Sequence, residues 1–261
     1  MAPLDERQKA SAAQFDRQSA NYGKGHILAD TSDVASLLNE VTLAPSARGL
    51  DIATGGGHTA LYLARRGCRM TLVDLAPRML EQAQAHLREI GCEAEGHLAP
   101  AEQLPFPDAS FEIVTCRVAP HHFSDPPGFV REAARVLRPG GHFMLIDGSV
   151  PDNDPESEEW LHRLETLRDP SHGRFHSRSN WEDMVHAAGL ECLRSELSPR
   201  LQPDLEWYFN AANTPPANRD RVREVIASAS DHVRTAMRLD DTGPIIQWWW
   251  PMLLLLARKP V

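Results

Sequence analysis

The sequence predicts an α/β protein built on a doubly wound, mostly parallel sheet, and three observations lead to this prediction. Between residues 49 and 146, short apolar segments of strand length alternate with amphipathic segments of helix length. This alternation implies crossover units and therefore parallel strands. Three glycines stand at the first strand-to-helix junction, and Asp74 ends the second predicted strand.

Residues 7–40 are predicted to be helical, with a break at 21–25, before the alternating region begins. The strands of that region are predicted at 49–53, 70–73, 93–99, 111–116 and 142–146. The helices between them are predicted at 58–66, 77–90 and 127–137, with Pro77 in a first turn and Gly67 and Gly91 at helix ends.

The last third of the chain departs from this pattern. A helix is predicted at 181–188, a strand at 190–197 and a final strand at 248–256. Residues 200–244 begin Pro- and Asn-rich and become helical from about Arg219 to Arg238. We therefore expect a single domain over residues 1–261, in which 200–244 is a helical insertion or lid packed over the sheet edge.

The composition limits the possible partners and location of the chain. The formal net charge of -9 argues against a nucleic-acid partner, because phosphate binding needs a basic surface. The longest apolar run, 248–257, is too short for a membrane span, and the first residues contain no apolar core of signal-peptide length. The four cysteines form no CxxC pair, so we expect free thiols and a cytoplasmic location.

The glycine turn indicates a nucleotide-like ligand. Glycine allows a ligand to approach the main chain, and the N–H groups that begin the next helix favour an anionic group. Asp74 follows Gly57 by seventeen positions, where a strand-terminal acid can accept both hydroxyls of a ribose. Gly55, Gly57 and Ala60 also fit the dinucleotide pattern G-x-G-x-x-A, so a nicotinamide-dependent oxidoreductase is an alternative on this motif.

Three further motifs occur in order: DIATGGG at 51–57, AEQLPFPDASFE at 101–112 and ARVLRPGG at 134–141. Together they resemble the class I S-adenosylmethionine methyltransferases, in the branch with the ubiquinone and menaquinone C-methyltransferases, over residues 15–150. The resemblance implies a Rossmann-like fold. It also implies in-line transfer of a methyl group from S-adenosylmethionine to an O, N or C nucleophile of a small molecule. A non-catalytic nucleoside-binding protein with the same fold is a second alternative.

The resemblance also assigns a cofactor site residue by residue. Its candidates are Tyr22, Asp51, Ala53, Thr54, Gly55, Gly57, Asp74, Leu75, Met79, Ala101, Glu102 and Arg117. The glycine turn and Arg117 would lie by the methionine portion, Asp74 by the ribose, and Leu75, Met79 and Ala101 by the adenine. Pro100 stands where the family usually has an adenine-binding aspartate, so either Glu102 replaces that contact or it is lost.

For some of these residues a structural role is the alternative. Asp51 could brace the loop, Tyr22 could pack a helix, and Met79 could belong to the core. Tyr22 matches a family position that often closes over the cofactor.

A sulfonium already activates its methyl group, so the protein needs a base only if the nucleophile holds its proton. His121 and His122 are the candidate bases, because they follow the fourth strand at the ligand-binding edge of the sheet. Their alternative role is to hydrogen-bond the loop. If residues 172–176 were helical, His172 and His176 would share a face and could form a metal site with Asp147. Gly173 disfavours a helix there, so we expect a solvated loop and no metal.

Aromatic residues in the last third indicate an apolar or aromatic acceptor. Trp207, Tyr208 and Phe209 open the insertion, and the triplet 248–250 precedes the last strand. Because neighbouring residues of a strand face opposite ways, only part of the tryptophan triplet can line one pocket.

Overall fold

The computed structural model describes residues 3–23 and 25–261, and its seven strands form one sheet in the order β3-β2-β1-β4-β5-β7-β6. The strands are β1 (Arg48–Ile52), β2 (Arg69–Asp74), β3 (Glu95–Leu98), β4 (Phe111–Arg117), β5 (Leu137–Gly148), β6 (Glu191–Gln202) and β7 (Trp248–Arg258). The pairs from β3 to β5 are parallel, and β7 runs antiparallel to both β5 and β6. The predicted mostly parallel sheet is confirmed.

Helices cover both faces of the sheet, as a doubly wound fold requires. The α-helices are α1 (Glu6–Gln18), α2 (Ser32–Leu38), α3 (His58–Arg65), α4 (Pro77–Arg88), α5 (Pro126–Val136), α6 (Pro155–Arg168), α7 (Arg178–Ala187), α8 (Leu205–Ala211), α9 (Pro216–Ala227) and α10 (Asp231–Ala236). The 3-10 helices are η1 (Ser19–Tyr22), η2 (Ile27–Ala29) and η3 (Pro120–His122). Side chains of α2, α3 and α4 pack in the core on one face, and those of α5 and α7 in the core on the other.

Local sequence signals explain where several of these helices begin and end. Asp5 and Gln8 form a capping box at the start of α1, and the Asp125 side chain caps α5 just before a first-turn proline. Gly67 and Gly91 follow α3 and α4 with φ of +89° and +75°, a left-handed conformation that suits glycine.

The structure corrects some of the predicted boundaries. Helix α6 was not predicted, although Asp154 caps it and a proline occupies its first turn. The single helix predicted over 219–238 is two helices, because α9 ends at Ala227 and Ser230 caps the start of α10. Strand β6 extends to Gln202, so the insertion begins after it. The predicted break at 21–25 contains Lys24, which lies outside the described residues.

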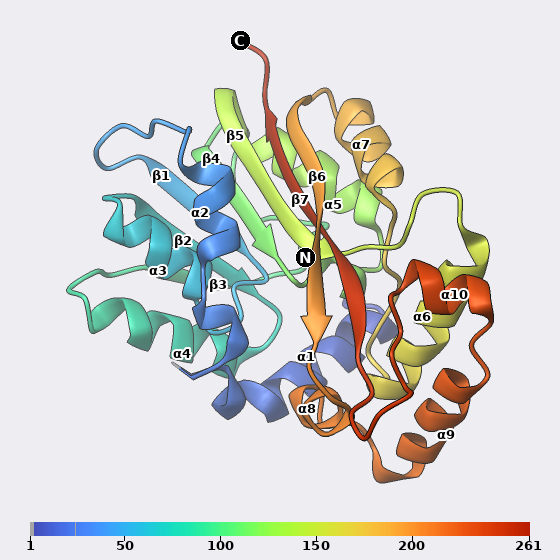
Figure 1. Cartoon of the computed structure of the whole chain (residues 1–261). Helices are drawn as coiled ribbons and strands as arrows, with labels where there is room; N and C mark the ends of the chain where they lie inside the picture. The colour runs from blue at the N-terminus through green and yellow to red at the C-terminus, as the bar shows by residue number, and fades with distance from the viewer. Residues whose placement is uncertain (1–2, 24) are drawn as a thin grey trace.

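The helices at the carboxyl ends of the parallel strands define where a site can form. In Figure 1, α1 and α8 lie across the lower end of the sheet, and α6, α9 and α10 gather beside them. The side chains of Val222, Ile226 and Val233 are buried in the same core as α2, α3 and α4, so the insertion packs into the main domain.

Two further observations concern the cysteines and the capacity of the helices to span a membrane. All four cysteines are free thiols, with Cys68 and Cys116 buried and Cys92 and Cys192 half-buried. Within the described residues, no helix combines the length and apolar character needed to cross a membrane.

Candidate functional site

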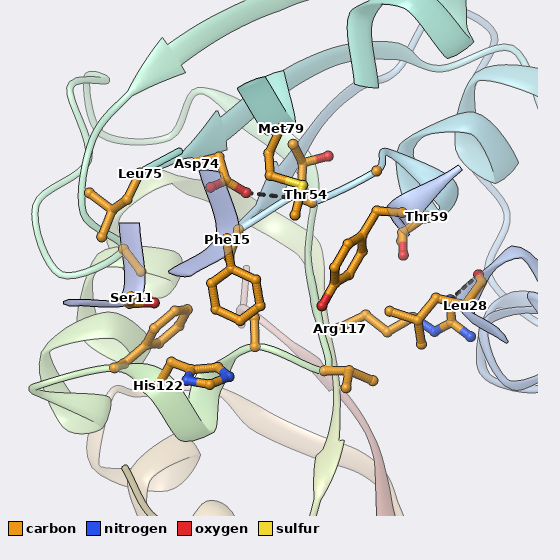
Figure 2. Close-up of a pocket in the computed structure, with 18 of the residues that line it drawn as sticks. Ser11, Phe15, Leu28, Thr54, Thr59, Asp74, Leu75, Met79, Arg117 and His122 are labelled. Atoms are coloured by element: carbon orange, nitrogen blue, oxygen red, sulfur yellow. Dashed lines mark hydrogen bonds between the residues drawn. The ribbon is translucent and has the colours of Figure 1, made fainter. Parts of the chain in front are cut away.

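A cavity of about 870 Å³ opens at the carboxyl ends of β1, β2 and β4 (Figure 2). Most of the predicted site residues line it: Tyr22, Ala53, Thr54, Gly55, Asp74, Leu75, Met79, Ala101, Glu102, Arg117 and His122. Helix α1 adds Gln8, Ser11 and Phe15. A concave site at this sheet edge, lined by apolar side chains and a few polar ones, suits a small organic ligand.

Asp74 and the glycine turn form a rigid wall of this first cavity. The Asp74 carboxylate accepts hydrogen bonds from the backbone N–H groups of Gly55 and Ala76, each at 2.9 Å. Gly55 has a φ of +52°, and a Cβ atom added there would meet only the Tyr22 ring, at 3.9 Å. Burial raises the pKa of the Asp74 carboxyl, even though both hydrogen bonds act to lower it. The two backbone bonds fix the carboxylate at the cavity wall.

Asp51 and Gly57 support the turn from behind and do not line the cavity. The Asp51 carboxylate is 2% exposed and accepts from the hydroxyls of Thr54 and Thr115, each at 2.7 Å. Burial raises its pKa to about 6. Gly57 has a φ of +79°, and a Cβ atom there would lie 2.8 Å from the Cβ of Ala83 on α4. Packing of the turn against α4 therefore explains this glycine, whereas sequence reasoning had assigned it to the ligand.

Arg117 holds the N-terminal segment against the cavity. Its guanidinium donates to Asp33 Oδ2, at 2.9 and 3.0 Å, and forms an ion-pair contact with Oδ1 at 2.8 Å. It also donates to the backbone carbonyls of Leu28, at 2.7 Å, and Asp30, at 2.6 Å. Figure 2 shows Arg117 reaching Leu28 at the edge of the cavity. Its donors are thus committed to residues 28–33, although the side chain still lines the cavity.

A second cavity, of about 860 Å³, adjoins the first. The two share the side chains of Phe15, Tyr22, Leu28, Val118 and His122 as common walls. Val118 has a φ of +53°, which is rare for a β-branched residue and marks local backbone strain. Figure 2 places Phe15 and His122 facing each other across this boundary, and their rings are 4.9 Å apart.

His121 and Asp147 form an imidazole–carboxylate pair at the second cavity. The Nδ1 atom of His121 lies 2.6 Å from Asp147 Oδ1, and its backbone N–H donates to Oδ2 at 2.9 Å. Burial is the largest single influence and lowers the pKa of His121, but the buried Asp147 carboxylate, with smaller contributions from Glu165 and Asp169, outweighs it and raises the pKa. Asp147 therefore orients the ring and stabilises its protonated form.

His122 is held as a neutral imidazole at the boundary. Its Nδ1 lies 3.0 Å from the carbonyl oxygen of Ser171, which can only accept, so Nδ1 carries the proton and Nε2 does not. Burial, together with the neighbouring His121, lowers its pKa to about 3. The surroundings therefore shift the pKa values of the two candidate bases in opposite directions.

The segment around His172 is not the solvated loop that we expected. His172 is 8% exposed, and its ring lies 5.3 Å from that of His121 and 4.8 Å from that of Phe175. His176 is half-buried, and its carbonyl accepts from Ser149. Across residues 3–23 and 25–261, no group of three His, Cys, Asp or Glu side chains is placed to hold a metal ion.

The aromatic residues divide between the second cavity and the core. Trp207 and Trp250 line the cavity with ring centroids 5.9 Å apart, whereas Trp248 is fully buried in the core. Trp249 is half-buried beneath the Arg238 guanidinium. Tyr208 and Phe209 are also core residues. Only part of the triplet faces the cavity, which confirms the prediction from strand geometry.

Sequence reasoning missed Phe15 and Arg200 among the cavity residues, and it considered Asp147, the partner of His121, only as a metal ligand. Asp147 carries a recognisable signal, because it comes near the end of a strand at the same sheet edge as Asp74. Phe15 and Arg200 carry none, since their place in the cavity depends on how α1 and the end of β6 fold over the sheet.

The comparisons agree with this architecture. The methyltransferase domain family matches residues 50–145. The uncharacterized methyltransferase YcgJ of Bacillus subtilis is 35% identical over 248 residues, which cover 94% of this chain and 97% of that protein. A putative methyltransferase structure from Bacillus halodurans superposes with a TM-score of 0.82 at 33% identity and covers 88% of this chain and 100% of its own.

A doubly wound sheet with a glycine turn and a strand-terminal aspartate is the arrangement typical of nucleotide-binding α/β proteins. With these relatives, the chain belongs to the class I S-adenosylmethionine-dependent methyltransferases. This membership decides against the nicotinamide-dependent oxidoreductase alternative.

Proposed function

We propose that the protein transfers a methyl group from S-adenosylmethionine in the first cavity to a small-molecule acceptor in the second. One observation carries the proposal: the two cavities share a wall at Phe15, Tyr22 and His122. A methyl group and a nucleophile could meet in line only where two such sites adjoin.

The residues of the first cavity suit the cofactor. Gly55 leaves room at the turn up to the Tyr22 ring, and the fixed Asp74 carboxylate offers its remaining lone pairs to a pair of ribose hydroxyls. Leu75, Met79 and Ala101 supply a largely apolar wall for an adenine ring. When bound, S-adenosylmethionine supplies the activated methyl group as a sulfonium, and the protein aligns the reactants and excludes water.

Glu102 is better assigned to bracing the loop than to recognising adenine. Its Oε1 accepts from the backbone N–H groups of Ser124, at 2.9 Å, and Asp125, at 3.3 Å, and its Oε2 accepts from Gln8 at 3.1 Å. These bonds join α1 to the loop before α5, so Glu102 holds the cavity closed at that end.

We assign the general base to His121. With Nδ1 held by Asp147, the neutral ring carries its lone pair on Nε2 and can take a proton from a hydroxyl or amine in the second cavity. The low pKa of His122 makes it a poor proton acceptor, so we assign it to positioning at the boundary.

A labelled-methyl transfer screen over phenols, amines and carbon acids tests the proposal. With an acceptor found, His121→Gln should lower kcat by about 10²–10⁴ with little change in cofactor affinity. Asp147→Asn removes the charge that raises the His121 pKa, so the acidic limb of the rate profile should move to lower pH. His122→Gln is the matched control and should keep that limb. Near wild-type turnover by His121→Gln would show that alignment alone suffices.

A further inference from the structure

The charged side chains of the second cavity differ in how well protein groups pair with them. Besides the imidazoles, its charged side chains are the guanidinium groups of Arg168 and Arg200 and the carboxylate of Asp169. Arg168 pairs with Glu165 at 3.0 Å and stacks on the rings of Tyr208 and Trp250. The Asp169 carboxylate accepts from the Ser171 N–H at 2.8 Å and its hydroxyl at 2.7 Å. Protein partners therefore satisfy both Arg168 and Asp169.

Arg200 lacks such a partner in the described part of the chain. Its one ion pair there is a 3.9 Å contact with Asp33, and it makes no hydrogen bond. Asp33 is already engaged by Arg117, at 2.8–3.0 Å. The Asp30 carboxylate also interacts electrostatically with both guanidinium groups, but among the described residues it forms an ion pair with neither. Burial is the main influence that lowers the pKa of Arg117, and the charge of Arg200 lowers it further, so the two guanidinium groups are close enough to repel each other.

The sheet places this cation beside an aromatic wall. Arg200 on β6 is the cross-strand partner of Trp250 on β7, and residues directly opposite in an antiparallel pair project from the same face. Trp250 lies 5.9 Å from Trp207 of α8, centroid to centroid. The Arg200 side chain is 27% exposed, so its guanidinium remains accessible to a ligand.

We propose that the acceptor is an aromatic carboxylate, whose ring lies against Trp207 and Trp250 and whose anionic group binds Arg200. A guanidinium matches a planar carboxylate with two parallel hydrogen bonds, and an aromatic body suits the tryptophan wall. This inference rests on the proposed role of the second cavity as the acceptor site.

Naphthoate and naphthamide serve as matched probes, because they share one ring system and differ in charge. Their binding is measured by calorimetry and by quenching of tryptophan fluorescence, with S-adenosylhomocysteine saturating. The wild type should bind naphthoate at least about tenfold more tightly, as expected for a charge-assisted hydrogen bond. Arg200→Gln should abolish the preference, and Arg200→Lys should keep part of it.

Arg258→Gln is the control, since Arg258 lies at the far end of β7 and pairs with Glu191. It should preserve the preference for naphthoate. Equal affinities in the wild type, no naphthoate binding, or a preference that survives Arg200→Gln would overturn the inference. A parallel loss of S-adenosylhomocysteine affinity in Arg200→Gln would also overturn it, because Arg200 would then serve the cofactor. Failure of the wild type to bind S-adenosylhomocysteine would instead count against the proposed function, and the probes can still be compared without it.

Discussion

At the scale of single residues, two aspartates near the ends of neighbouring strands have different surroundings. Asp74 lines the first cavity and binds two backbone N–H groups, whereas Asp51 is enclosed by two threonine hydroxyls behind the turn. A motif can place both near the cofactor, but only the packed loop decides which carboxylate faces the cavity.

Asp74→Ala should weaken binding of S-adenosylhomocysteine by about 10- to 100-fold, because hydrogen bonds to a charged acceptor are worth about 1.5–3 kcal/mol. Calorimetry on the folded variant measures this change. Asp51→Asn is the contrasting variant and should lower the free energy of unfolding more than it lowers ligand affinity. Unchanged affinity in Asp74→Ala would remove Asp74 from the cofactor site.

At the scale of elements, the sequence predicts most strands and helices of the alternating region better than it predicts the helices outside that region. Strands β1, β2 and β4 are short apolar runs whose burial is decided locally, so their positions are predicted to within one or two residues. The role of α1 cannot be predicted in this way. Its described side chains are mostly exposed or half-buried, and it reaches the cavities through Phe15 and through polar contacts such as Gln18 with the Ala212 carbonyl.

Helix α1 is therefore the element that we expect to respond most to ligand. Few of its side chains are buried, so it can open locally, and a ligand that binds only the closed form protects it. At a ligand concentration of 100 times Kd, the exchange of α1 amides should slow by up to about 100-fold with S-adenosylhomocysteine. Helix α9, whose Val222 and Ile226 are buried in the core, should change little.

Hydrogen exchange measured by mass spectrometry on the free and bound protein tests this expectation. The same experiment tests the prediction that the insertion is a lid. Protection gained in α9 and not in α1 would make the insertion the moving cover, and equal exchange in both states would make both elements static.

At the scale of the whole molecule, the second cavity is assembled from segments far apart in the chain. Phe15, His121, Trp207 and Trp250 come from α1, η3, α8 and β7. Their convergence depends on how the N-terminal helix and the insertion pack around the sheet. Aromatic composition could therefore suggest an apolar acceptor, but it could not place the cation Arg200 beside the tryptophans.

Buried imidazoles also connect the site to global stability. Burial lowers the pKa of His122 to about 3, that of His26 to about 4, and that of His172 well below its ordinary value. In the unfolded chain the pKa of each histidine lies near 6.5. Below that pH the unfolded chain therefore binds protons that the folded chain does not bind. Their contribution to stability is thus complete above about pH 6.5 and is lost as the pH falls toward the lower folded-state values. The raised pKa values of His121 and Asp51 act in the opposite sense.

His122→Gln isolates one of these contributions. A single imidazole that stays neutral in the folded state costs about 1.4 kcal/mol per pH unit below its unfolded pKa, or about 2 kcal/mol between about pH 6.5 and pH 5. The free energy of unfolding of His122→Gln, measured by urea titration, should therefore fall by about 2 kcal/mol less than that of the wild type over this interval. His186→Gln, at an exposed histidine of α7, is the control and should follow the wild type. If His122→Gln loses stability as steeply as the wild type, His122 is protonated in the folded protein, and its assignment as a neutral positioning residue is wrong.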